Sequence, residues 1–224
     1  MSIELKKRII TSILLFILLI LISIYDYILI VSLIIIGIIA WIEFYALISK
    51  IFKKSNYKNI ALRFILKAAS LLYLTYVVSI IIISKLNLPD FYILILYIIL
   101  ISIMTDIGGL IVGKIFKGKK LTKISPNKTI SGSIGSFVFS LFLIPFFYNF
   151  LNLYTNMSFF NIFLITLFIS FISQFGDLFI SLMKRKANVK NTSDLLPGHG
   201  GILDRIDGIV FAVPLGILLF KIFL

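Results

Sequence analysis

The sequence predicts an all-α protein: a polytopic bundle of about seven transmembrane helices, with a cytoplasmic N-terminus and a single integral membrane domain over residues 1–224. Its mean hydropathy is +1.13 and 60% of its residues are hydrophobic, far above the values of a soluble domain. Apolar runs of about 18 residues or more recur, and each can cross roughly 30 Å of hydrocarbon. Basic residues gather in alternate connections, which orients the spans.

The apolar runs predict seven spans along the chain. We place them at residues 9–25, 27–48, 66–84, 91–113, 134–152, 159–182 and 208–224. The first run imitates a signal peptide. It is longer than a signal-peptide core and no small-residue cleavage site follows it, so we interpret it as the first span.

The basic residues set the orientation. Of the 22 lysines and arginines, 20 lie in the N-terminal segment or in the second, fourth and sixth connections. By the positive-inside rule this side is cytoplasmic. An even number of spans would spoil the alternation of basic and non-basic connections, so seven spans are favoured. The net charge of +13 is also typical of nucleic-acid-binding proteins, but charges beside spans are better explained by topology and an anionic substrate. We therefore expect no nucleic-acid partner. The absence of cysteine excludes disulfides and thiolate metal sites.

The most informative stretch is residues 181–207, SLMKRKANVKNTSDLLPGHGGILDRID, a polar run between two apolar spans. It contains basic residues, a glycine-rich turn, the single histidine and two aspartates three apart. Glycines such as Gly200 and Gly201 let backbone N–H groups approach phosphates, and His199 is suited to donating to a phosphate or moving a proton. The alternative is an ordinary surface turn, which the adjacent LDRID sequence disfavours.

Acidic residues cluster at the cytoplasmic ends of the predicted spans. Four of the nine lie there: Asp106, Asp177, Asp204 and Asp207. A carboxylate inside a span costs roughly 2.5–3.5 kcal/mol on insertion scales, so each requires a reason. The alternative for each is pairing with a lysine or arginine. We interpret Glu43, near another cytoplasmic helix end, as a weaker candidate that pairs with a lysine.

Helical spacing places these acids on shared faces. Asp177, Ser181 and Lys184 lie at i, i+4 and i+7 of the sixth span. Asp204 and Asp207 lie at i and i+3 near the start of the seventh, where a helix N-terminus favours anions and their bound partners. Three converging carboxylates repel unless a cation lies between them, and hard oxygen ligands suit Mg²⁺.

A second polar loop runs from Thr105 to Gly135. Asp106 precedes Gly109 and Gly113 at i+3 and i+7, a stripe that also fits close helix packing. Most of the lysines that follow are explained by topology. In the SPNKT turn, by contrast, Ser125, Lys128 and Thr129 combine two hydroxyls with an ammonium, a set suited to gripping a triphosphate. The turn is not a P-loop.

These motifs resemble the signature of the CDP-diacylglycerol synthase (phosphatidate cytidylyltransferase) family. The matching residues in the main segment are Ser181, Lys184, Arg185, Lys190, His199, Gly200, Gly201, Asp204, Arg205 and Asp207, preceded by Gly176 and Asp177. The upstream elements look like Asp106, Gly108, Gly113, Lys114, Ser125, Pro126, Lys128 and Thr129. Two positions depart from the pattern: Asn191 and Ser131 stand where the family usually has Asp and Glu.

The resemblance implies transfer of a cytidylyl group from CTP to phosphatidate, giving CDP-diacylglycerol and pyrophosphate for phospholipid biosynthesis. It implies a multi-pass protein of the inner (plasma) membrane with a cytoplasmic active site, in which Asp177 and Asp204 hold Mg²⁺, with room for a second cation. The implied catalytic residues are Lys184, Arg185, Lys190, His199, Arg205 and Asp207. The implied substrate-binding residues are Asp106, Lys114, Ser125, Lys128, Thr129, Ser181, Gly200 and Gly201. Residues 101–224 then carry the catalytic spans and loops, and residues 1–100 the N-terminal spans.

Other functions stay open at this point. A CTP-dependent lipid kinase or an archaeal-type lipid cytidylyltransferase would share the architecture, and a kinase would release CDP instead of pyrophosphate. A silent homologue is suggested by Asn191 and Ser131. A cation transporter is disfavoured because the acids gather at one membrane edge. The expected partners are CTP, phosphatidate and the lipid bilayer, and the wide apolar faces allow a homodimer.

Overall fold

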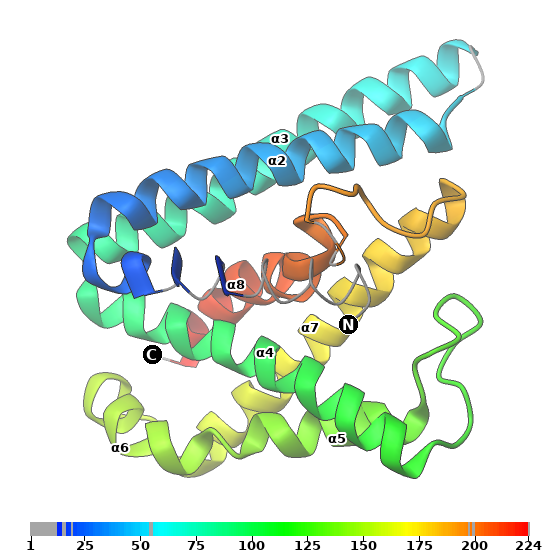
Figure 1. Ribbon diagram of the computed structural model, residues 1–224. Helices are drawn as coiled ribbons and strands as arrows, with labels where there is room; N and C mark the ends of the chain where they lie inside the picture. Colours follow the sequence, from blue (N-terminus) through cyan, green and yellow to red (C-terminus); the bar gives the residue numbers. More distant parts are fainter. Residues whose placement is uncertain are drawn as a thin grey trace. The chain divides into compact units, whose positions relative to one another are not determined.

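The computed structural model describes residues 13–14, 17–18, 20–53, 56–196, 198 and 200–223. Within these residues the regular structure is helical, and pairing of β type is limited to two isolated bridges. The helices are α2 (Asp26–Ile51), α3 (Tyr57–Asn87), α4 (Pro89–Phe116), α5 (Ile130–Leu141), α6 (Ile144–Thr155), α7 (Phe159–Lys186) and α8 (Leu203–Phe223) (Figure 1). The predicted all-α class is confirmed.

Five helices of the described chain are long and apolar enough to cross a membrane: α2, α3, α4, α7 and α8. The pair α5 and α6 makes a sixth candidate. These helices confirm a multi-pass membrane protein. The predicted first span, residues 9–25, lies largely outside the described residues.

The span predicted over residues 134–152 corresponds to α5 and α6, which are bent by 53° at the break between them. Pro145 explains the break. A proline inside a helix clashes with the carbonyl four residues earlier, here Leu141, and has no N–H to donate. Accordingly α5 ends at Leu141, and Pro145 falls in the first turn of α6, where its missing N–H costs nothing.

The chain divides into two compact units. The first consists of Met1–Ile82 and Met183–Ile206, and the second of Ile83–Leu182 and Asp207–Leu224. Helices α7 and α8 each contribute residues to both units. The predicted site residues are therefore described unit by unit.

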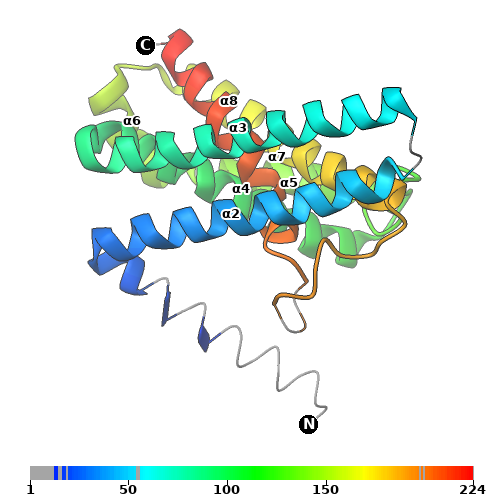
Figure 2. The same cartoon turned by 90° about the horizontal axis from the view of Figure 1, so that it is seen from above.

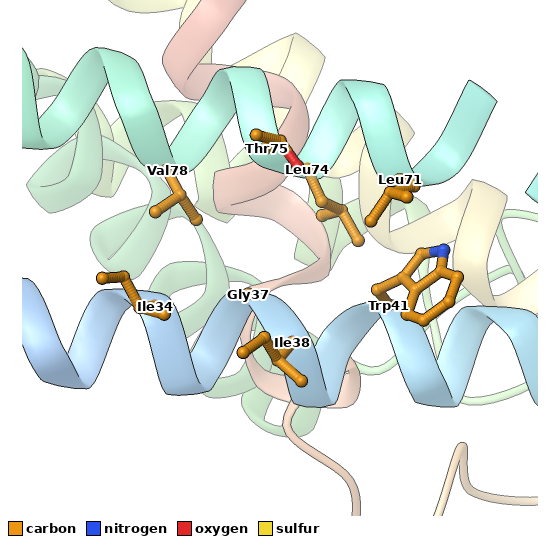
Figure 3. Close-up of a pocket in the computed structure, with 8 residues that line it drawn as sticks. All are labelled: Ile34, Gly37, Ile38, Trp41, Leu71, Leu74, Thr75 and Val78. Atoms are coloured by element: carbon orange, nitrogen blue, oxygen red, sulfur yellow. The ribbon is translucent and has the colours of Figure 1, made fainter. Parts of the chain in front are cut away.

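In the first unit, α2 and α3 run side by side (Figures 1 and 2). They approach closely at Gly37, where an added Cβ would lie 2.8 Å from the Cγ2 of Val78. Beside this contact lies an apolar hollow of about 180 Å³ (Figure 3), lined by Ile34, Gly37, Ile38, Trp41, Leu71, Leu74, Thr75 and Val78. The indole N–H of Trp41 donates to the carbonyl of Lys67 at 3.3 Å, and the Lys67 ammonium lies 3.3 Å from the ring centroid of Tyr45. These contacts join the two helices close to Glu43.

In the second unit, α4 and α5 pack through small residues. A Cβ on Gly135 would lie 2.4 Å from the Cβ of Val112, and one on Gly109 would lie 2.7 Å from the hydroxyl of Ser136. The hydroxyl of Ser136 donates to the carbonyl of Thr105 at 2.7 Å. This confirms the packing alternative for the glycine stripe of α4.

Hydroxyl groups attach α7 to this pair. Thr105 of α4 donates to Ser170 of α7 at 2.8 Å, and Ser133 of α5 donates to Gln174 of α7 at 2.6 Å. Such bonds satisfy polar side chains that would otherwise be stranded among apolar helices. They fix the part of α7 that carries Asp177 against the start of α5.

Replacement of Gly135 by Ala is expected to destabilise the second unit by about 1–3 kcal/mol, because the added methyl overlaps Val112 on a rigid helix. The change can be measured as the fraction of folded protein that survives heating in detergent, followed by size-exclusion chromatography. Ile134→Ala on the same helix, at a side chain that is 59% exposed, is the matched control. Equal survival of the two variants would contradict the predicted close contact.

Candidate active site

The first unit joins the end of α7 to the start of α8 through an ion pair. The Nζ of Lys184 donates to Oδ1 of Asp204 at 2.6 Å, and the two side chains are 16% and 9% exposed. The other oxygen, Oδ2, accepts from the N–H of Thr192 at 2.9 Å and the N–H of Gly201 at 3.1 Å. It also lies 3.0 Å from the Thr192 hydroxyl, which shares its single proton between Asp204 and Glu43. Asp204 is thus held on both oxygens.

The glycine-rich turn is closed by reciprocal backbone bonds between Leu196 and Gly200, at 2.9 and 3.0 Å. Gly198 and Gly200 have φ of +78° and +86°, a region that disfavours side chains. Because the N–H of Gly201 is bonded to Asp204, this turn organises a carboxylate in the structure. His199 lies outside the described residues, so its predicted role stays a prediction.

Glu43 of α2 shares the Thr192 hydroxyl with Asp204, a position that the sequence interpretation did not assign to it. Its side chain is buried, 3% exposed, and its described hydrogen bonds come from neutral donors instead of a lysine. Two of these donors are the N–H groups of Ile202 and Leu203, at 3.0 and 2.8 Å. The anion at the N-terminus of α8 is therefore a side chain of the protein itself.

In the second unit, Asp177 of α7 forms an ion pair with Lys128 and accepts from the hydroxyl of Ser181 at 3.4 Å. Lys128 is placed by the loop between α4 and α5, where its N–H donates to Ser125 at 3.1 Å and its carbonyl accepts from Leu121 at 2.8 Å. The predicted SPNKT turn therefore presents its lysine to the predicted carboxylate.

The hydroxyl of Thr129 caps α5 by accepting from the N–H of Gly132 at 3.0 Å. This bond satisfies one of the N–H groups that a helix start leaves unpaired. Ser131, one of the two departures from the family pattern, bonds the Thr129 hydroxyl at 3.0 Å and donates to the carbonyl of Lys117. Both hydroxyls thus shape the start of α5, and phosphate binding by Thr129 stays a prediction.

Acidic side chains converge in the second unit. Asp207 is 6% exposed, and Asp177 and Asp106 lie close enough to interact with it electrostatically. Carboxyl groups this close require a proton or a cation between them. In the described part of the chain, no group of three or more His, Cys, Asp or Glu side chains is placed so that it could hold a metal ion. The predicted Mg²⁺ therefore stays a prediction, and it would need further ligands from water or phosphate.

The remaining predicted residues are basic side chains at the surface. Lys114, Arg185, Lys190 and Arg205 are exposed. Asn191, the other departure from the family pattern, lies against the turn, with its Cγ 3.4 Å from where a Gly200 Cβ would be. The structure therefore assembles two groups, one around Asp204 in the first unit and one around Asp177 in the second.

Comparison with known proteins identifies the family of this chain. The chain matches the model of the cytidylyltransferase family over residues 6–223. It is 43% identical over 126 residues to a phosphatidate cytidylyltransferase of Staphylococcus haemolyticus, covering 54% of this chain and 46% of that protein. The corresponding enzyme of Bacillus subtilis is 44% identical over 111 residues (49% and 40%), and that of Rickettsia typhi 42% over 116 residues (49% and 50%). The chain spans about half the length of these curated relatives. Since the family model covers nearly all of it, the chain belongs to the cytidylyltransferase family.

Proposed function

We propose that this protein transfers a cytidylyl group from CTP to phosphatidate, forming CDP-diacylglycerol and releasing pyrophosphate. The names of the relatives support this activity. The structural observation that carries the proposal is that each unit holds one lysine–aspartate pair from the predicted motifs. These are Lys184–Asp204 in the first unit and Lys128–Asp177 in the second.

The charges of such a pair match those of a metal–nucleotide complex: the aspartate is opposite in charge to the cation, and the lysine is opposite in charge to the phosphates. When the complex binds, the aspartate can exchange its lysine partner for the metal cation, and the lysine can then pair with a phosphate oxygen. Neither charged group is left buried and unpaired. The exposed Arg185 and Arg205 can offset further charge on the triphosphate and the lipid phosphate. The main task of these residues is to hold two polyanions together against their repulsion.

We propose Asp177 and Asp204 as ligands of Mg²⁺, supported by Asp207, and we extend the proposal to a second cation. When bound, Mg²⁺ supplies charge neutralisation at the triphosphate and polarises its phosphorus–oxygen bonds. A phosphate oxygen of phosphatidate then bonds to the α-phosphorus of CTP, and the bond to the β-phosphate breaks. The lipid phosphate is already anionic near neutral pH, so no strong base is required.

The proposed active site faces the cytoplasm at the inner membrane. The last turn of α7 carries Lys184, Arg185 and Lys186, and the last turn of α4 carries Lys114. By the positive-inside rule, this basic charge supports a cytoplasmic location for both helix ends. The bilayer is the expected environment of the apolar helices, and their exposed faces allow a homodimer.

The reaction is tested with CTP labelled at two positions. Purified protein in detergent micelles is given phosphatidate, Mg²⁺ and CTP labelled at either the α- or the γ-phosphate. We expect α-label in the lipid and γ-label in pyrophosphate. In a parallel assay with a lipid alcohol, γ-label in the lipid and release of CDP would identify a kinase instead. No lipid label, with the Bacillus subtilis relative active alongside, would overturn the proposal.

Replacement of Lys128 by Met is expected to lower kcat/KM for CTP by about 10- to 100-fold, the range for losing one charge-assisted hydrogen bond. Met keeps the length of the chain but leaves Asp177 without its described ionic partner. Steady-state kinetics with varied CTP measure the change. Lys123→Met, at an exposed lysine of the same loop, is the control. Equal effects would show that only the charge of the loop matters.

A further inference from the structure

Each carboxylate oxygen of Glu43 lies within hydrogen-bond distance of two donors. Oε1 accepts from the hydroxyl of Ser193 at 2.6 Å and the N–H of Ile202 at 3.0 Å. Oε2 accepts from the hydroxyl of Thr192 and the N–H of Leu203, both at 2.8 Å. The donors lie 149 to 160 residues away in the sequence. One side chain of α2 thus holds both ends of the segment that leads into α8.

The start of α8 depends on this carboxylate. A helix leaves its first N–H groups without partners, and a Ser, Thr, Asp or Asn just before the helix usually accepts from them. Here Ile202 precedes Leu203 and has no acceptor in its side chain. Glu43 supplies the missing acceptor from another helix, with a charge of the sign that a helix N-terminus favours.

Thr192 connects Glu43 to Asp204. Its hydroxyl lies 2.8 Å from Oε2 of Glu43 and 3.0 Å from Oδ2 of Asp204. Its N–H also donates to Asp204 at 2.9 Å. Asp204 is in turn the partner of Lys184. A displacement of Glu43 is therefore transmitted to the carboxylate and the lysine that the proposed function uses.

We infer that Glu43 is a positioning residue of the active site. It does not touch the substrates; it fixes the segment 192–203 and the first turn of α8 so that Asp204 and Lys184 face the metal–nucleotide complex. This role rests on the proposed function. It makes α2 part of the catalytic apparatus, although the sequence motifs lie entirely after residue 100.

The variant Glu43→Gln tests the inference with almost no change in shape. The amide offers one acceptor oxygen and one NH₂ group, so whichever way it turns, one backbone N–H of Ile202 or Leu203 loses its acceptor. We expect hydrogen exchange of peptides covering residues 192–203 to rise at least about tenfold, with peptides from α4 and α5 unchanged. We expect kcat/KM for CTP to fall by about 10- to 100-fold, since misplacements of about 1 Å cost as much, while KM for phosphatidate stays the same.

Two further measurements separate positioning from general loss of structure. Ser49→Ala removes an α2 hydroxyl whose described hydrogen bond, to the carbonyl of Tyr45, lies within its own helix. It is the matched control and should show neither effect. Because Glu43 and Thr192 act in one network, the double variant Glu43→Gln/Thr192→Val should lose less than the combined losses of the two single variants.

Wild-type exchange and wild-type kcat/KM in Glu43→Gln would overturn the inference. Faster exchange throughout α4 and α5 would also overturn it, because Glu43 would then support the whole fold. If the wild-type protein made no CDP-lipid, the proposed reaction would fail, yet local exchange in residues 192–203 would still decide whether Glu43 anchors this segment.

Discussion

Replacement of Asp204 by Asn is expected to lower kcat/KM by about 100- to 1,000-fold, the loss typical of removing one preorganised electrostatic group from an active site. The amide oxygen of Asn can still accept from the N–H groups of Thr192 and Gly201, which keeps the segment folded. Its NH₂ group then faces the ammonium of Lys184, where the carboxylate had formed an ion pair. The variant retains the shape of the site and loses the charge that would hold a cation.

Kinetics in mixed micelles measure this loss, with Mg²⁺ varied at saturating CTP. Asp194→Asn is the matched control, because Asp194 is an exposed acid of the same loop. Membrane insertion and size-exclusion behaviour should be those of the wild type for both variants. If Asp204→Asn kept its turnover, Asp204 could not be a ligand of the catalytic cation.

Local patterns predicted most of the helices. The apolar runs that became α2, α3, α4, α7 and α8 are each long enough to cross a bilayer, so length and composition alone identified them. The break between α5 and α6 was missed because hydropathy is the same on both sides of it. Pro145 was the available signal, since a proline inside a helix kinks or breaks it.

Contacts within one helix or turn were the part of the site that the sequence predicted most directly. Asp177 and Ser181 are one helical turn apart, and the structure confirms their contact. The pairing of Asp177 with Lys128 and of Asp204 with Lys184 depends on tertiary structure. Sequence reasoning offered both lysine pairing and metal binding for these acids, and the structure shows that pairing does occur.

Glu43 could not be assigned from local pattern, because its donors lie about 150 residues further along the chain. Two weak signals existed. A carboxylate in an apolar span requires a partner, and α8 begins without a capping side chain of its own. Neither signal indicates that Glu43 is the acceptor for the N-terminus of α8. That pairing follows from the packing of α2 against the loop.

Replacement of Gly201 by Ala is expected to cost at least as much activity as loss of Asp204, because it drives apart the residues that hold Asp204. An added Cβ would lie 2.0 Å from the Thr192 hydroxyl and 2.6 and 2.7 Å from the two oxygens of Glu43. Glu43 cannot easily move aside, since its oxygens are fixed by hydrogen bonds. Overpacking of this kind costs about 1–3 kcal/mol of stability. The displaced hydrogen bonds add to that cost.

The measurement for Gly201→Ala is turnover per folded molecule, with the folded fraction taken from size-exclusion chromatography. Leu195→Ala is the control in the same loop, at a side chain that is 52% exposed. We expect Gly201→Ala to lose about 100-fold or more in kcat/KM after correction for folding, and to raise hydrogen exchange in residues 192–203 as Glu43→Gln does. An active, slowly exchanging Gly201→Ala protein would show that the loop can separate from Glu43 without disturbing Asp204, and the two residues would then act independently.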